Sequence, residues 1–223
     1  MSIWTSDQGI GAVLKGTALW LVMVMPALAG AGAAQEASGG APLRVTVDGR
    51  AIVVTGPPGY CVDRSASREG PEGAFVLLGS CAALGGGRAA PRDTPAVLVA
   101  TIAPGASGEG LDPEAFGDLA SFFTSEAGRA ALSRSGTASS VQVLEVLSVG
   151  DVLFLRIADK DAAEGQALDT EYWRAILSLR GRMVTLSVLS EAGRPLPAGG
   201  GRAVLDAFVA RMQAANPSRA AEP

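Results

Sequence analysis

The sequence of 223 residues contains no histidine, and only two of its 18 basic residues are lysines, Lys15 and Lys160. The absence of imidazole excludes Ser-His-Asp triads, Cys-His pairs and metal sites that use histidine ligands. It also removes the side chain that most often responds to pH near neutrality. The scarcity of lysine leaves little scope for Schiff-base or Ser-Lys chemistry. The composition therefore favours a binding protein over an enzyme.

Charge is also sparse, because charged residues make up 18% of the chain and the formal net charge is −4. A mildly acidic chain lacks the basic surface that nucleic acids and anionic membranes require. The sequence contains no G-x-S-x-G or S-x-x-K motif and no nucleotide-binding glycine motif. We therefore expect no nucleic-acid partner, no cofactor and no catalytic residue.

One long apolar run is present, over residues 16–34, and it ends in alanine and glycine. Lys15 before the run, Pro26 within it and the small residues at its end are typical of a cleaved secretory signal peptide. We therefore predict a signal peptide over 1–34, export to the periplasm and no stable membrane span after cleavage. The alternative is an uncleaved 16–34 segment that anchors the protein to the inner membrane.

Only two cysteines are present, Cys61 and Cys81, and both follow the predicted signal peptide. In an oxidising compartment an isolated pair predicts a disulfide bond. Two thiolates alone do not complete a zinc site, and a C-x-x-C redox motif is absent. We therefore predict a structural disulfide.

The rest of the chain has the length of one domain, about 189 residues after removal of 34 from 223. Residues 35–42 are polar and rich in glycine, which predicts a flexible lead-in. Residues 43–216 are expected to form a single α+β domain, and 217–223 a disordered tail.

Apolar and β-branched runs around turn residues indicate three hairpins. Two more apolar runs have the length of strands, whereas the segment 59–73 is polar and is expected to be irregular. The hairpins are 43–47 with 51–55, 141–149 with 152–158, and 170–180 with 182–190, and the two single strands are 74–81 and 95–103. In the first arm of the third hairpin, Trp173 falls on an apolar face, and the opposite face is expected to be partly wet.

Amphipathic spacing predicts helices in two places, one after the first four strands and one after the last four strands. Asp112 before Pro113 is expected to cap the first, with Phe116, Leu119, Ala120 and Phe123 on its buried face. Thr124 or Ser125 begins a short second helix. The closing helix should bury Leu205, Phe208, Val209 and Met212 and end at Asn216-Pro217.

These elements define a fold class, because sequential hairpins pair antiparallel and amphipathic helices must cover a sheet. We predict an α+β fold in which a large antiparallel sheet, built from hairpins, carries two main amphipathic helices.

This order of elements resembles the PsbP-like fold, in which a proline and an aromatic residue follow the first hairpin. Pro57, Pro58 and Tyr60 stand in that place here. The segments GYCVDRSASRE, FVLLGSC and FFTSEAGRAALSRSG resemble parts of small exported proteins of alphaproteobacteria. The resemblance implies export and an envelope location, and it implies no activity.

Candidate partner-binding residues are an aromatic side chain and arginines, which are common anchors at protein interfaces. Three arginines lie in the third hairpin, and one more follows the first cysteine. The candidates are Tyr60, Arg64, Arg174, Arg180 and Arg182.

Two groups of acidic residues are candidate reactive sites. Glu145, Glu171 and Asp63 could converge in the fold and act as a carboxylate pair in a hydrolase. Asp159, Asp161, Glu164 and Asp169 could gather around a hard cation. Because their spacing fails the EF-hand pattern and Lys160 lies among them, we expect a solvated loop and no metal.

The sequence therefore predicts an exported envelope protein that acts as a non-catalytic binding or accessory module for another envelope protein. A carrier of a small apolar ligand is the first alternative, since so apolar a sheet could enclose a cavity. A hydrolase that uses only carboxylates is a weaker alternative.

Overall fold

The computed structural model describes residues 40–85, 95–105, 115–162 and 167–217. The chain divides into two compact units, Met1–Ala34 and Gln35–Pro223, and every described residue belongs to the second. The predicted signal peptide, most of the lead-in and the end of the tail thus lie outside the described residues. Among the residues that are described, no helix is both long enough and apolar enough to cross a membrane.

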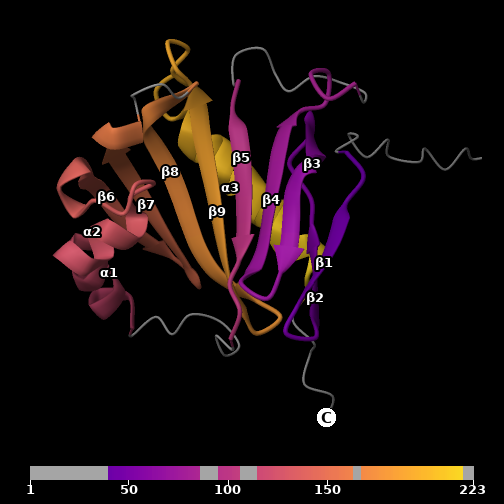
Figure 1. The fold of residues 1–223 in the computed structure, drawn as a ribbon, viewed down its shortest axis with the longest axis horizontal. Helices are drawn as coiled ribbons and strands as arrows, with labels where there is room; N and C mark the ends of the chain where they lie inside the picture. Colours follow the sequence, from indigo (N-terminus) through magenta and orange to yellow (C-terminus); the bar gives the residue numbers. More distant parts are fainter. Residues whose placement is uncertain (1–39, 86–94, 106–114, 163–166, 218–223) are drawn as a thin grey trace, which may run out of the picture. The chain divides into compact units, whose positions relative to one another are not determined.

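The second unit is built on a seven-stranded antiparallel sheet of order β3-β4-β5-β9-β8-β7-β6, and β1 and β2 form a separate hairpin (Figure 1). The strands are β1 Leu43–Val47, β2 Arg50–Val54, β3 Tyr60–Gly70, β4 Gly73–Ser80, β5 Val97–Ile102, β6 Val141–Val149, β7 Val152–Asp159, β8 Leu168–Leu179 and β9 Arg182–Glu191. The helices are α1 Phe116–Thr124, α2 Glu126–Leu132 and α3 Gly200–Ala215. This architecture confirms the predicted α+β class.

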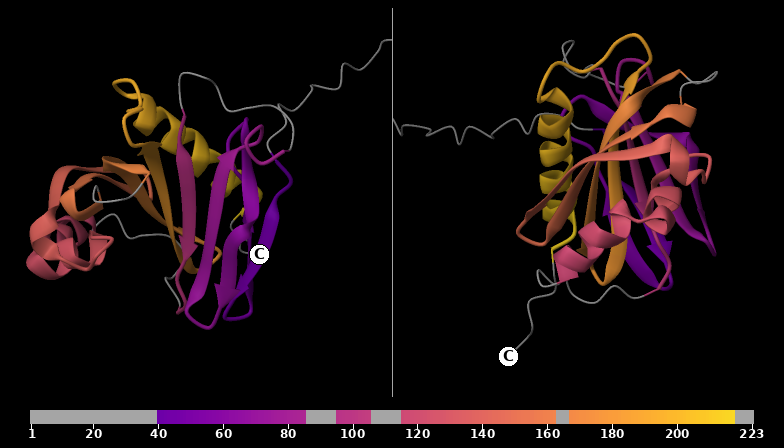
Figure 2. Two further views of the ribbon diagram at one scale, coloured as in Figure 1. Left: turned by 45° about the horizontal axis from the view of Figure 1, so that its top comes forward. Right: turned by 90° about the vertical axis from the view of Figure 1, so that its left-hand side faces the viewer.

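Helices cover both faces of the sheet (Figure 2). The α3 helix packs with the β1-β2 hairpin on one face, whereas α1 and α2 pack on the other face over β6, β7 and β8. Leu177 of β8 is buried on the α3 face, and Ile176 is buried beside α1 and α2. The partly wet face predicted for β8 is therefore drier than expected, because Tyr172 and Ile176 on that face are buried against residues of α1 and α2.

The main error of the sequence prediction is β3, since 59–73 was expected to be irregular. The segment instead pairs with β4 from Tyr60 to Gly70, with a bulge between Asp63 and Arg68. The Asp63 carboxylate accepts hydrogen bonds from the backbone amides of Ser65 (2.9 Å) and Ala66 (3.1 Å) and thereby shapes the bulge. The bulge and the polar side chains together remove the alternation of apolar and polar residues by which a strand is recognised in a sequence.

The predicted disulfide is confirmed, because Cys61 and Cys81 are bonded. Cys61 lies near the start of the outer strand β3, and Cys81 follows the end of β4. The bond therefore fastens one edge of the sheet at a point where β3 is otherwise held by a single neighbouring strand.

The helix predictions are confirmed where they can be compared. Ser125 caps α2 by accepting a hydrogen bond from the Gly128 amide at 3.1 Å, and the predicted face of α3 is buried. The structure begins α1 at Phe116 with Ala115 as N-cap, and Asp112 lies outside the described residues.

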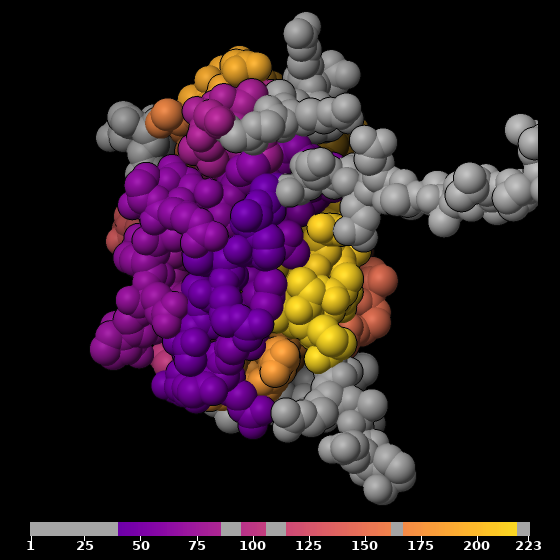
Figure 3. Space-filling view, turned by 90° about the vertical axis from the view of Figure 1, so that its right-hand side faces the viewer, coloured from indigo at the N-terminus to yellow at the C-terminus, as the bar shows by residue number. Residues whose placement is uncertain are grey.

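The end of α3 has a function in the fold that the sequence did not reveal. Asn216 accepts a hydrogen bond from the Val53 amide (2.8 Å) and donates one to the Val53 carbonyl (2.8 Å). Its side chain thus pairs with β2 as a neighbouring strand would. The C-terminal end of α3 and the β1-β2 hairpin are therefore fixed to each other beside the sheet (Figure 3).

Candidate binding groove

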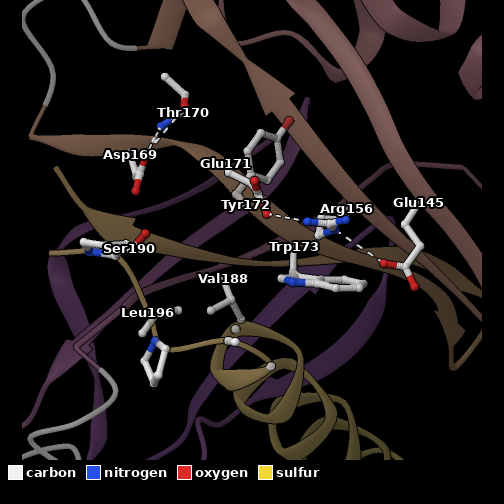
Figure 4. A pocket seen from close by; sticks show the side chains of 15 residues that line it. Glu145, Arg156, Asp169, Thr170, Glu171, Tyr172, Trp173, Val188, Ser190 and Leu196 are labelled. Atoms are coloured by element: carbon white, nitrogen blue, oxygen red, sulfur yellow. Dashed lines mark hydrogen bonds and ion pairs between the residues drawn. The ribbon is translucent and has the colours of Figure 1, made fainter. Parts of the chain in front are cut away.

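A groove of about 580 Å³ lies on the α3 face of the sheet, beside the N-terminal end of α3 (Figure 4). Strands β6, β7, β8 and β9 supply its floor, and the connection from β9 to α3 supplies its wall. Since four strands and a helix end meet there, the groove is the place where residues far apart in sequence come together.

Trp173 of β8 forms the centre of the floor, next to Arg156 on β7 and Val188 on β9 in the strand register. The indole is only partly buried. A Cβ atom placed on Gly201 would lie 2.9 Å from the indole Cδ1 atom. Glycine at this position therefore allows α3 to begin against the indole, and a larger residue would displace one of the two.

Arg202 of α3 covers the aromatic side chains beside the groove. Its guanidinium lies 3.9 Å from the ring centre of Phe154 and 5.6 Å from that of Trp173, within the range of cation–π attraction. Its Nε donates a hydrogen bond to Asp206 one turn later on α3, at 2.9 Å. The charge of Arg202 is thus already paired within the helix.

Arg156 links three neighbouring strands across the groove. Its Nη1 donates to the Glu171 carboxylate of β8 at 2.9 Å, and its Nε lies 3.4 Å from the Glu145 carboxylate of β6. The hydrogen bond to Glu171 raises the pKa of the guanidinium, which stays charged. With Asp169, the lining has three carboxylates and one guanidinium, so the groove carries excess negative charge.

The wall of the groove is held by short backbone contacts. The Gly200 amide donates to the Pro197 carbonyl at 2.7 Å, and Gly199 caps α3 in the left-handed region at φ 75°. Arg194 pairs with Glu191 at 2.9 Å at the end of β9. Two prolines and these contacts restrict the connection, so the wall is largely preformed.

The structure brings together two of the three carboxylates that were considered as a reactive group. Glu145 and Glu171 meet at Arg156, whereas Asp63 lies on β3, at the opposite edge of the sheet. There the Ser65 hydroxyl and the Ala66 amide lower the pKa of Asp63 by hydrogen bonding to its carboxylate. Arg156 lies between the two glutamates and pairs with both of them.

Two of the candidate partner-binding residues lie in the interior. Tyr60 is 2% exposed and belongs to the core on the α3 face. Arg182 is 8% exposed and donates to the backbone carbonyls of Val47, Asp48 and Gly105 at 2.9–3.1 Å. Their side chains are committed to the fold, so neither is available on the surface to a partner.

The other candidates do not form one cluster. Arg64 donates to the Pro42 carbonyl at 3.3 Å on the β3 edge, and Arg180 occupies the exposed β8-β9 turn. Arg174 points to the α1–α2 face, where its Nε donates to the Ser187 hydroxyl at 3.2 Å. Partner binding by these three arginines stays a prediction, and each would act alone.

A buried polar network lies under α2, on the face opposite the groove. Asp159 is fully buried, in contrast to the solvated loop predicted there, and it accepts hydrogen bonds from the Ser140 hydroxyl (2.8 Å) and the Arg134 amide (2.9 Å). The Tyr172 hydroxyl donates to the Leu132 carbonyl at 2.8 Å. Burial raises the pKa of Tyr172 and lowers that of Arg134. The network fastens α2 to the sheet.

The acidic group around Asp159 does not gather into a cation site in the part of the chain that the structure describes. Its fourth member, Glu164, lies outside the described residues.

Sequence reasoning raised the Glu145–Glu171 pair but missed Arg156 and the groove around it. Trp173 was expected to be a core residue on the apolar face of β8. A period of two places Glu171 on the same face of that strand, and this was the signal that a charged residue joins the tryptophan there.

No protein-family model matches the chain, and no match is found among curated proteins. Among solved structures, the chain is similar to the crystal structure of the Saccharomyces cerevisiae Ran-binding protein Mog1p, with 14% sequence identity and a TM-score of 0.41. The alignment covers 78% of this chain and 94% of that chain. A likeness of this strength assigns neither a family nor a function to the chain.

Proposed function

We propose that this chain is an exported protein of the bacterial envelope that binds another envelope protein through the groove and catalyses no reaction itself. The observation that carries the proposal is the groove, with a partly exposed tryptophan on its floor and an excess of carboxylates around it. Tryptophan in a preformed hollow with charged surroundings is typical of the anchor points of protein interfaces.

Export is supported by two independent features of the chain. The apolar run 16–34 ends in small residues, and the Cys61–Cys81 disulfide belongs to an oxidising compartment such as the periplasm. N-terminal sequencing of protein recovered from the periplasm should give a start near residue 35. An intact 16–34 segment in the membrane fraction would support the anchored form instead. A relationship to PsbP-like proteins is part of this proposal and adds no activity to it.

The two alternatives fit the groove less well. A small apolar ligand would have to lie against Glu145, Arg156 and Glu171 and would remove water from these charges without replacing their hydrogen bonds. A hydrolase is favoured by one observation, the shared orientation of Glu145 and Glu171. Arg156 pairs with both carboxylates, so neither of these two glutamates is left without a charged partner to activate water.

A photocrosslinking residue at Leu196, in the wall of the groove, tests the proposal in the periplasm. We expect one discrete protein adduct from Leu196 and none from the same residue at Leu84, which is 40% exposed after the far strand β4. Reversal of the groove charge by Glu171→Lys should reduce the adduct about tenfold. Equal adducts from Leu196 and Leu84, or an adduct that Glu171→Lys leaves unchanged, would overturn the proposal.

A further inference from the structure

The outer strand β6 borders the groove and has a neighbour, β7, on one side only among the described strands. In an antiparallel pair, half of the backbone amides and carbonyls of each strand point away from its partner. An outer strand therefore presents a row of hydrogen-bonding groups to which another extended chain can pair.

The sequence of β6 does little to prevent such pairing. Its nine residues, VQVLEVLSV, contain one charged residue, Glu145, and no proline or lysine. Leu147 and Val149 are 36% and 57% exposed, although both are large apolar residues of the outer strand. A bulge between Val143 and Glu145 bends the strand before this stretch but leaves 145–149 regularly paired with β7.

The exposed apolar residues lie on the same face as the groove. Glu145, Leu147 and Val149 alternate along β6, so their side chains point to one face of the sheet. Glu145 lines the groove, and the β7 partners of Leu147 and Val149 are Phe154 and Val152 of the α3-side core. An acidic groove thus continues directly into an apolar strip along the free edge of β6.

We propose that β6 is a docking strand, to which an extended segment of the partner adds as an eighth antiparallel strand. Read from its N-terminus, the segment carries apolar side chains opposite Val149 and Leu147 and a basic side chain opposite Glu145. The basic side chain follows from charge complementarity with Glu145, Glu171 and Asp169, which exceed the single Arg156. Backbone pairing provides the affinity, and the alternate side chains provide the specificity. The inference rests on the proposed function, because Glu145 belongs to both surfaces.

The probe is the blocked peptide acetyl-SGVTVTKSG-amide, with acetyl-SGVTVTESG-amide as the matched control. In hydrogen exchange of the purified protein, we expect the lysine peptide to protect the amides of β6 and to leave those of β3 unchanged. The lysine peptide should bind about tenfold more tightly than the glutamate peptide. Equal binding of the two peptides, or protection at β3 in place of β6, would overturn the inference.

Two neighbouring substitutions separate the two faces of β6. Leu147→Gln removes an apolar contact on the groove face and should weaken the lysine peptide about tenfold, whereas Ser148→Gln on the opposite face should change its binding by less than about twofold. Equal losses in both variants would contradict the assigned face. Circular dichroism of each variant shows whether the fold is retained.

The peptide and crosslinking experiments can fail independently. Adducts from Leu196 without protection of β6 would overturn the docking strand and keep the groove as the binding site. Protection of β6 without adducts would overturn the proposed function and keep the strand. Protection of β6 that grows with protein concentration in the absence of peptide, with a dimeric mass, would identify a second copy of this chain as the occupant and overturn the inference.

Discussion

The two outer strands of the sheet, β3 and β6, both carry a bulge, but they differ in charge, in covalent fastening and in the exposure of their apolar residues. Four of the eleven residues of β3 are charged, and the strand is bulged over Asp63 and fastened by the disulfide. Arg68 of β3 lies 4.2 Å above the Phe75 ring and covers it. β6 has a single charged residue and leaves Leu147 and Val149 exposed.

The fold therefore closes one edge of the sheet and leaves part of the other accessible. Charges, bulges and covering elements are the ordinary means by which proteins prevent association at sheet edges. At β3 these means are combined, and β1 packs against the same strand. At β6, a bulge lies between Val143 and Glu145 and the helices α1 and α2 cover one face, but the stretch 145–149 is regularly paired and leaves Leu147 and Val149 exposed. This exposed stretch beside the groove is the strongest sign that the edge serves binding. Four predictions test this contrast.

Loss of the disulfide should have the largest effect, because it opens the closed edge. The double variant Cys61→Ser/Cys81→Ser should lose about 3 kcal/mol of unfolding free energy, through the larger conformational freedom of the unfolded chain. Urea unfolding measures the change, and reduction of the unmodified protein serves as the control. Binding of the lysine peptide at β6 should be unchanged, and its loss would show that the two edges are not independent.

Arg182→Leu should destabilise the protein by about 2 kcal/mol, because the carbonyls of Val47, Asp48 and Gly105 lose their donor in the interior. The matched control is Arg180→Leu in the exposed turn, which should change stability by less than about 0.5 kcal/mol. Hydrogen exchange should become faster in the β1-β2 hairpin and stay unchanged in β6. Similar losses of unfolding free energy in the two variants would contradict the role of Arg182 in anchoring the β1-β2 hairpin.

Tyr172→Phe should lower the unfolding free energy by about 1 kcal/mol, since it removes the hydrogen bond from β8 to the Leu132 carbonyl that fastens α2 to the sheet. Burial raises the pKa of Tyr172 above its ordinary value of 10.0, so the folded state retains a proton that the unfolded state releases. The stability of the unmodified protein should therefore be independent of this group below pH 10 and fall as the pH rises above it. The difference in unfolding free energy between the unmodified protein and Tyr172→Phe should therefore become smaller at high pH. A difference that does not change with pH would contradict the raised pKa of Tyr172.

The smallest change is expected at the accessible edge itself. Val149 and Val152 are cross-strand partners, yet Val149 is 57% exposed and Val152 only 4%. Val149→Thr should change the unfolding free energy by less than about 0.5 kcal/mol, whereas Val152→Thr should cost about 1–2 kcal/mol. Thermal unfolding of the two variants provides the test. An equal loss of unfolding free energy in the two variants would mean that Val149 is covered in solution.

The sequence predicted the hairpins well because their apolar runs are bounded by strong turn residues. The β8-β9 turn is an example, since Arg180 and Gly181 both adopt positive φ in a two-residue loop. It predicted α3 for a similar reason, since its buried residues recur at helical spacing. β3 was not predicted because it is an outer strand that is held by backbone hydrogen bonds. Its polar side chains do not show the alternation of apolar and polar residues by which a strand is recognised.

The groove could be predicted only in part, because it depends on the order of strands in the sheet. Glu145, Arg156 and Glu171 meet only when β6, β7 and β8 are neighbours in the observed register. The burial of Tyr60 and Arg182 likewise depends on long-range packing, since Arg182 bonds to carbonyls more than one hundred residues earlier in the chain. Their residue types are typical of interface anchors, but their positions in the fold bury both side chains.

The position of Trp173 has a practical consequence for study of the chain without its first 34 residues, the form that the proposed export would give. The sequence contains three tryptophans, and two of them, Trp4 and Trp20, precede residue 35. Once the first 34 residues are removed, the indole on the groove floor is the sole tryptophan fluorophore of the chain. Its emission therefore reports the polarity of the groove without any label, and a partner that excludes water there should shift the emission to shorter wavelength.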